Sequence, residues 1–465
     1  MQHLRKHITA PASIAPLVVF RVFFGGIMAA SIIRFAARGW IADLYVEPAY
    51  YFTYYGFGWV QPLGAVGMYA LFAVMGLAAL AIMLGLYYRA ATVVFFLTFT
   101  YVELTDVTNY LNHYYFVSII SFLLIWVPAN RHFALDVVRK PQWRVDTVPA
   151  WTINIFKLQL GIVYVFAGLA KLNPDWLFEA MPLKLWLPAQ AHLPVIGSLL
   201  AEPLTAYAFS WAGALYDLTI VFFLLYRRTR LWAYGAVVVF HGCTALLFPI
   251  GMFPYIMIGC TLIFFSPAFH QKVIAALRRL GRRIVPSRAH PSPAPSAAWM
   301  MRPLAGRLLT GLLVLHFALQ LLVPLRFALY PGDLFWTEQG YRFSWRVMLM
   351  EKAGYTVFHI HDPATDRSWE VANYEYLTPN QEKMMATQPD LILQFAHFLE
   401  KQYREQGLGD VAITAESYVT LNGRRSRPFI DSTIDLTTVC PGFGHKTWIL
   451  PFEENAHTDV LHPPQ

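Results

Sequence analysis

Residues 152–172 read TINIFKLQLGIVYVFAGLAKL, and this run decides the kind of fold that the chain adopts. Within it, only Lys157 and Lys171 carry a charge. A helix that crosses a bilayer needs about 20 consecutive, mostly apolar residues. The run therefore predicts a membrane-spanning helix, with Lys171 at its end.

The composition of the whole chain extends this prediction. Of the 465 residues, 57% are hydrophobic and 14% are charged, whereas about a quarter of the residues in soluble domains are charged. So many apolar side chains cannot be hidden in one soluble core without leaving large exposed patches. We expect a polytopic helical bundle of about nine transmembrane helices. They are expected at residues 16–33, 66–86, 91–105, 114–128, 152–172, 211–225, 231–247, 252–265 and 308–329, the third, fourth and eighth being short.

The basic residues indicate an orientation rather than a nucleic-acid partner. The net charge is +8, but Lys and Arg cluster between the apolar runs. With a cytoplasmic N-terminus, 18 basic residues fall in inner loops and three in outer loops, as the positive-inside rule requires. The region after the last span is then extracytoplasmic. Residues 287–298 (SRAHPSPAPSAA) are expected to form a flexible cytoplasmic linker.

Beyond residue 330 the pattern is that of a small α+β domain. Residues 355–361 alternate as a strand that 368–376 would pair with, and 388–406 have helical spacing. Residues 411–421 and 427–436 predict a hairpin that turns at Asn422-Gly423. The fold class is therefore mainly α, with a transmembrane domain at 1–330 and an extracytoplasmic α+β domain at 331–465.

Ionisable residues inside apolar runs are costly, and each is a possible functional group. Arg21 and Asp217 lie in the first and sixth runs, where they are expected to pair with each other or with neighbouring dipoles. Glu103 and Arg326 lie near outer ends of runs, where side chains reach water easily. We therefore rank Glu103 and Arg326 lower as candidate functional residues.

Lys171, His113 and His241 each have a structural and a functional interpretation. Lys171 either snorkels to the interface or is partly buried, which favours a neutral amine able to act as a base. His113 opens the fourth run and His241 lies within the seventh, and both are either hydrogen-bonded structural residues or site residues. Both Lys171 and His113 are expected near the outer face, so the three could line one outward pocket.

Motifs of several other enzyme classes are missing. The sequence has no Walker loop, dinucleotide fingerprint or H-E-x-x-H. His359 and His361 alternate on a predicted strand without a third ligand, and the three cysteines lack metal-ligand spacing. We therefore predict no metal site.

Several stretches, in order and similarly spaced from about residue 14 to 437, carry a resemblance to a known family. They are VFRVFFGGIMA (19–29), MLGLYYR (83–89), NHYYF (112–116), ANRHFALD (129–136), VYVFAGLAKLNPDW (163–176), FHGCTALLFPIGMFPY (240–255), GYRFSWRVML (340–349) and SYVTLNGRRSRPFIDSTIDL (417–436). The chain resembles the vitamin K-dependent gamma-glutamyl carboxylases and their prokaryotic relatives, with an HTTM-like membrane domain.

The resemblance implies an enzyme that oxygenates vitamin K hydroquinone, a reduced naphthoquinone, to its epoxide and carboxylates glutamate in a polypeptide, with O2 and CO2 as co-substrates. Lys171 matches the base that deprotonates the quinol, and Asn112 and His113 match the pair beside the reacting centre. His241 matches a histidine at the cofactor, and Tyr341 matches a tyrosine implicated in substrate binding. A cofactor is needed because no side-chain base removes the γ-hydrogen of glutamate.

Two alternatives remain open. One is a quinol epoxidase or monooxygenase without protein carboxylation; the other is a non-catalytic binding or transport protein on the same scaffold. The better-known relatives carry a lysine where this chain has Ala170, so docking of a substrate propeptide is not assumed. The matched lysine and histidines argue against the non-catalytic alternative.

Overall fold

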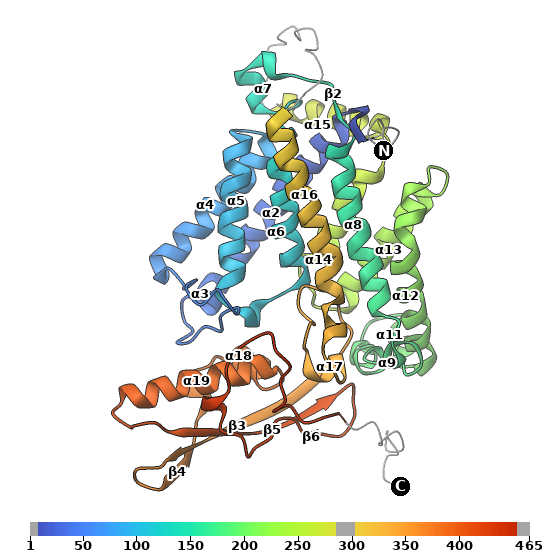
Figure 1. Cartoon of the computed structure of the whole chain (residues 1–465). Coiled ribbons are helices and arrows are strands. Elements are labelled where there is room, and N and C mark those ends of the chain that lie inside the picture. The colour runs from blue at the N-terminus through green and yellow to red at the C-terminus, as the bar shows by residue number, and fades with distance from the viewer. Residues whose placement is uncertain (1–7, 285–302, 453–465) are drawn as a thin grey trace.

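The structure is a computed structural model that describes residues 8–284 and 303–452. It has a bundle of helices with a small sheet at one end (Figure 1). Each apolar run predicted from the sequence contains one helix in the described part of the chain. These helices are α2 (Ala15–Ala37), α4 (Gly64–Leu84), α5 (Tyr88–Thr105), α6 (Asn112–Trp126), α8 (Trp151–Ala170), α12 (Pro203–Leu225), α13 (Arg230–Leu247), α14 (Phe253–Thr261) and α16 (Pro303–Leu322). The predicted linker at 287–298 lies outside the described residues.

Six helices in the described ranges are long and apolar enough to cross a membrane. They are α2, α4, α8, α12, α13, and α16 together with the 3-10 turn that extends it to Leu329. α6 and α14 are apolar but shorter, and α5 is not among the six. The chain is thus a multi-pass membrane protein. The three helices that fall short are those whose predicted runs were short.

Arg21 shows how a charge is accommodated inside the bundle. It is fully buried on α2 and donates to the carbonyl oxygens of Ile82 (2.8 Å), Met83 (2.7 Å) and Phe133 (2.6 Å). The last carbonyls of a helix lack N–H partners from a following turn. The guanidinium therefore supplies donors at the end of α4, where the Ile82 carbonyl also accepts from the Gly85 N–H at 3.1 Å. Gly85 is required here, because its φ is 65° and an added Cβ would lie 2.6 Å from Arg21 Nη1. Of the two pairings expected for Arg21, the structure shows neighbouring dipoles and not Asp217.

Further elements cap the two ends of the bundle. They are β1 (Pro11–Ser13), β2 (Thr147–Pro149), α3 (Trp40–Tyr45), α7 (Leu135–Arg139), α9 (Pro174–Leu177), α10 (Leu183–Trp186), α11 (Gly197–Leu200), α15 (Pro267–Ile284) and α17 (Leu334–Thr337). In Figure 1, α7, β2 and α15 lie at the end away from the sheet, whereas α3, α9, α11 and α17 lie at the end that faces it.

The sheet has four antiparallel strands in the order β4-β3-β5-β6. Its strands are β3 (Lys352–Asp362), β4 (Arg367–Glu370), β5 (Ala412–Leu421) and β6 (Arg427–Pro428). Two helices, α18 (Pro379–Met385) and α19 (Pro389–Glu405), lie between the sheet and the bundle (Figure 1). The rings of Phe358 on β3 and Phe395 on α19 are 5.2 Å apart, which places the core between these layers.

Two strand predictions are too long. The strand expected at 427–436 ends at Pro428, because Asp431 turns the chain by accepting hydrogen bonds from the backbone N–H (3.0 Å) and hydroxyl (2.7 Å) of Thr433. The strand expected at 368–376 ends at Glu370 and is followed by a 3-10 turn at Asn373–Glu375. A turn-forming side chain overrode the alternating pattern in the first place, and a 3-10 turn of the backbone ended the strand in the second.

The segment between α17 and β3 returns to the bundle. Trp345 is 1% exposed and stacks on Tyr115 of α6, with ring centroids 4.9 Å apart. The backbone has positive φ at Phe343, Trp345 and Met348, a conformation that costs a non-glycine residue free energy and that persists where packing holds it. The sheet-bearing part and the bundle are therefore joined by buried contacts.

A second junction lies at the turn between β5 and β6. Arg424 donates to both carboxylate oxygens of Asp175 on α9 at 2.7 and 2.5 Å, and Asn422 donates to the same carboxylate at 2.6 Å. Glu351, before β3, accepts a hydrogen bond from Trp186 of α10 at 2.7 Å. These contacts hold the sheet beside the end of α8.

Candidate active site

Lys171 caps the C-terminal end of α8 and is buried rather than exposed. Its Nζ lies 2.6 Å from Asp217 Oδ2 on α12, and the residues are 6% and 5% exposed. Nζ also donates to the carbonyl oxygen of Ala167 at 3.4 Å. The expectation that Lys171 snorkels to the interface is wrong, because Asp217 supplies inside the bundle the partner that a buried ammonium requires.

A small, mostly apolar cavity of about 100 Å³ opens beside this ion pair. Its lining includes Lys171, Asp217, His241 and the rings of Trp176, Trp186, Phe240, Phe248 and Phe253. His241 on α13 is 2% exposed, and its Nε2 lies 3.2 Å from the hydroxyl of Tyr164. Its Nδ1 is buried without a hydrogen-bond partner among the described residues. The cavity therefore combines flat apolar walls with a few polar atoms.

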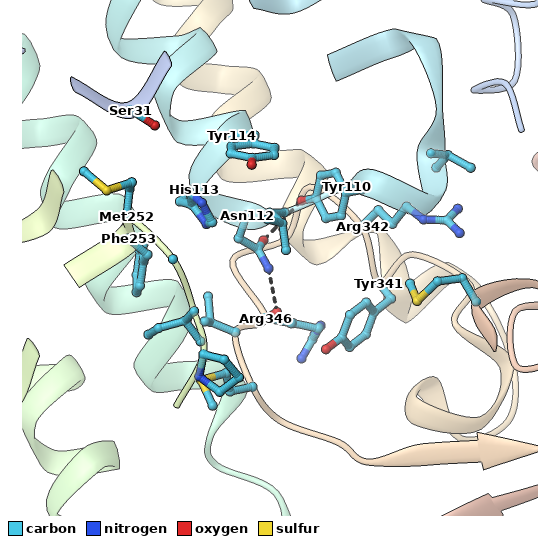
Figure 2. A pocket seen from close by; sticks show the side chains of 18 of the residues that line it. Ser31, Tyr110, Asn112, His113, Tyr114, Met252, Phe253, Tyr341, Arg342 and Arg346 are labelled. Atoms are coloured by element: carbon cyan, nitrogen blue, oxygen red, sulfur yellow. Dashed lines mark hydrogen bonds between the residues drawn. The ribbon is translucent and has the colours of Figure 1, made fainter. Parts of the chain in front are cut away.

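A larger cavity of about 630 Å³ holds the other matched residues, Asn112, His113 and Tyr341 (Figure 2). Asn112 is held at both ends of its amide, since its Nδ2 donates to the carbonyl oxygen of Arg346 (2.9 Å) and its Oδ1 accepts from Tyr110 (3.1 Å). The amide is thus fixed in orientation.

The His113 ring is less constrained. It is 7% exposed and packs against Tyr114 and Phe253, with ring centroids 4.6 and 5.9 Å away. Within residues 8–284 and 303–452 it makes no hydrogen bond. A buried imidazole without a fixed partner can hydrogen-bond a molecule in the cavity.

The two cavities adjoin, and four residues line both of them. These shared residues are Ile250, Phe253, Val347 and Met348. Phe253 lies between the histidines, because its ring centroid is 5.9 Å from that of His113 and 5.7 Å from that of His241. The structure thus divides the predicted residues, with Lys171 and His241 on one side and Asn112, His113 and Tyr341 on the other. The single pocket expected from the sequence is two adjoining cavities.

The larger cavity is electropositive. Arg34, Arg38, Arg342 and Arg346 line it, with Glu338 as the only carboxylate in its described lining. Arg342 also pairs with Asp390 at 2.5 Å. Burial raises the pKa of the Tyr341 phenol above its ordinary value, so this hydroxyl is a neutral donor and acceptor. Such a cavity favours an anionic ligand, for example a carboxylate.

Among the described residues, no three His, Cys, Asp or Glu side chains gather as a metal site. His359 and His361 of β3 face carboxylates instead, at 4.0 Å from Glu370 and 3.9 Å from Asp366.

Sequence reasoning missed two features of the site. It did not pair Lys171 with Asp217, although both residues were identified as possible functional groups because charges are rare in apolar runs. It also missed the arginines of the larger cavity, of which Arg342 and Arg346 flank the matched Tyr341 in the stretch GYRFSWRVML.

Comparison with known proteins agrees with this architecture. Residues 9–269 match the HTTM domain, and residues 305–455 match the lumenal domain of vitamin K-dependent gamma-carboxylase. No solved structure matches the chain. The first match covers the helices that carry Lys171, Asp217, His113 and His241, and the second covers the sheet and Tyr341. The chain therefore belongs to the vitamin K-dependent gamma-carboxylase family.

Proposed function

We propose that the protein couples oxygenation of a reduced naphthoquinone to its epoxide with carboxylation of glutamate in a polypeptide. The observation that carries this proposal is the Lys171–Asp217 pair, buried at 2.6 Å beside an aromatic cavity. That cavity adjoins an arginine-lined one. A membrane enzyme that brings an apolar quinol to an acidic polypeptide needs both environments side by side.

The residues of the smaller cavity fit a naphthoquinone. Its rings would stack on a flat bicyclic molecule, and the unpartnered Nδ1 of His241 would hydrogen-bond an oxygen of that molecule. When bound, the quinol supplies with O2 the strong base that no side chain provides. Lys171 and His241 would hold its polar oxygens, and the aromatic walls would exclude water.

Lys171 would act as a base together with Asp217. Their hydrogen bond allows Lys171 to pass one ammonium proton to Asp217 while its Nζ takes a proton from the quinol hydroxyl. The pair then carries one more proton than before, and its net charge rises from zero to +1. Asp217 thereby supplies the acceptor that a buried ammonium lacks on its own.

In the larger cavity, His113 and Asn112 would serve the glutamate side chain. The fixed amide of Asn112 would orient it, and His113 would hydrogen-bond it or CO2 next to the shared wall at Phe253. Tyr341 and Arg346 would bind carboxylate oxygens of the polypeptide. CO2 addition places a second carboxylate on the same side chain, which a positive cavity stabilises.

We further propose that the N-terminus is cytoplasmic and the sheet extracytoplasmic. The basic helix α15 lies at the end of the bundle opposite the sheet (Figure 1), which the positive-inside rule assigns to the cytoplasm. Residues 1–330 would form the catalytic transmembrane domain. Residues 331–465 would form an extracytoplasmic domain that supports the substrate and contributes Tyr341 and Arg346 to the larger cavity.

The test is an assay of the purified chain with a reduced naphthoquinone, oxygen, labelled bicarbonate and a glutamate peptide. Epoxide and peptide-bound label are measured separately. Both products are expected in wild-type protein. Epoxide without label would identify a quinol epoxidase, and absence of both would refute the proposed function.

A further inference from the structure

Glu103 is a carboxyl group inside the bundle that the proposed chemistry does not use. It lies in the last turn of α5, two residues before that helix ends at Thr105. The sequence suggested that it reaches water easily. The structure shows the opposite for one oxygen, because Oε1 is buried without a hydrogen-bond partner, while Oε2 accepts from Ser118 at 2.6 Å. Asn109 and Tyr114 line a cavity of about 40 Å³ with it.

The surroundings of Glu103 favour the protonated acid. Its titratable electrostatic neighbours in the described chain are phenols, and none is a cation. They are Tyr45, Tyr54, Tyr110, Tyr114 and Tyr115, while Arg34 lines the larger cavity together with Tyr114 and His113. A buried carboxylate with one unsatisfied oxygen costs far more free energy than the neutral acid. Glu103 differs in this respect from Asp217, which has Lys171 beside it.

The Glu103 cavity borders the His113 cavity. Tyr114, Ser31 and Phe35 line both, and Figure 2 shows Tyr114 beside His113 in the larger one. The rings of these two residues have centroids 4.6 Å apart. The smaller space exceeds the ~30 Å³ that a water molecule takes up in liquid, and Ser31, Asn109 and Tyr114 offer polar partners. One phenol therefore separates a neutral acid from the proposed reaction site.

We propose that Glu103 is a proton-holding residue of the His113 cavity. Its carboxyl O–H bond breaks as a proton passes, directly or through one water, to the Tyr114 hydroxyl oxygen. The O–H bond of Tyr114 breaks at the same time, and that proton bonds to an acceptor in the cavity, either the His113 imidazole or a water molecule. The Ser118 hydroxyl stabilises the resulting carboxylate until the reverse transfer restores the acid. No electrons are exchanged and no net proton is consumed. The inference rests on the proposed function, in which protons leave both the quinol and the glutamate carbon.

The first test is infrared spectroscopy of the full-length protein, which does not depend on activity. At neutral pH, wild-type protein should show the carbonyl band of a protonated carboxylic acid that Glu103→Gln lacks. Identical spectra of the two proteins in this region would show that Glu103 is ionised and overturn the inference. If wild-type protein makes no epoxide, the proposed function fails and this spectrum still decides the state of Glu103.

The second test measures turnover. Glutamine keeps the size of Glu103 and an oxygen for the Ser118 hydroxyl, so a purely structural role predicts an unchanged rate. The inference predicts that Glu103→Gln lowers kcat by about tenfold or more, leaves KM for the peptide unchanged and alters the solvent isotope effect. Ser118→Ala keeps the proton and should reduce kcat less. An unchanged rate in Glu103→Gln, or an equal fall in Ser118→Ala, would overturn the inference.

Discussion

Replacing Arg424 with alanine removes the paired hydrogen bonds that hold the 422–424 turn against α9. Arg424 and Asp175 are each 16% exposed, so water screens their contact only partly. A hydrogen bond to a charged group contributes about 1.5–3 kcal/mol, and Asn422 still donates to the carboxylate at 2.6 Å after the change. We therefore expect the variant to lose about 2–3 kcal/mol of local stability, which is a factor of about 30–140 in the opening equilibrium.

Hydrogen exchange followed by mass spectrometry measures this opening directly. Amides of the turn and of β6 should exchange faster by that factor in Arg424→Ala, because exchange follows the population of the open form. The matched control is Arg404→Ala, whose ion pairs with Glu400 and Asp410 lie on an exposed face where Arg404 is 58% exposed. Such pairs contribute about 0.2–1 kcal/mol.

The same variant connects stability with activity. Asp175 follows Lys171 by four residues, so loosening of the turn should disturb the end of α8 and lower the rate of epoxide formation. If Arg424→Ala exchanges at the same rate as Arg404→Ala, the Asp175 contact does not hold the sheet to the bundle.

Two further predictions concern the sheet-bearing region. Burial raises the pKa of Asp390, but Arg342 outweighs this effect and holds that pKa below its ordinary value, so the stability contribution is complete above about pH 3.9 and is lost as the pH falls below it. The melting temperature of Asp390→Asn should accordingly lie below that of wild type at neutral pH and converge with it in acid; a constant difference would contradict this. A reporter fused after Leu436 should be active only on the outer side, and cytoplasmic activity would refute the orientation.

The course of the chain through the bundle was largely predictable. Apolar length predicted a helix in every run from α2 to α16, because about 20 apolar residues have few other stable arrangements in lipid. Alternation and the Asn422-Gly423 turn predicted β3 and β5, which pair along their whole length. The local sequence pattern is therefore sufficient to predict a helix or strand where one face of that element must be buried.

The site was less predictable, because it depends on how helices rotate against one another. The sequence marked Arg21, Lys171 and Asp217 as costly charges, but only packing decides that Asp217 faces Lys171 whereas Arg21 faces the end of α4. Likewise, no periodic pattern in the sequence predicts that Trp345 has a positive φ and is buried against the bundle. Contacts between distant segments fixed these positions.

The central claim is that the buried Lys171–Asp217 pair takes the proton from the quinol. Its most direct measurement is the rate of epoxide formation by Lys171→Ala, with Lys157→Ala as the control because Lys157 lies on the same helix outside both cavities. We expect Lys171→Ala to fold, to lose epoxide formation and to regain part of it with small free amines, while Lys157→Ala stays near the wild-type rate. Epoxide formation by Lys171→Ala at the wild-type rate would contradict the account.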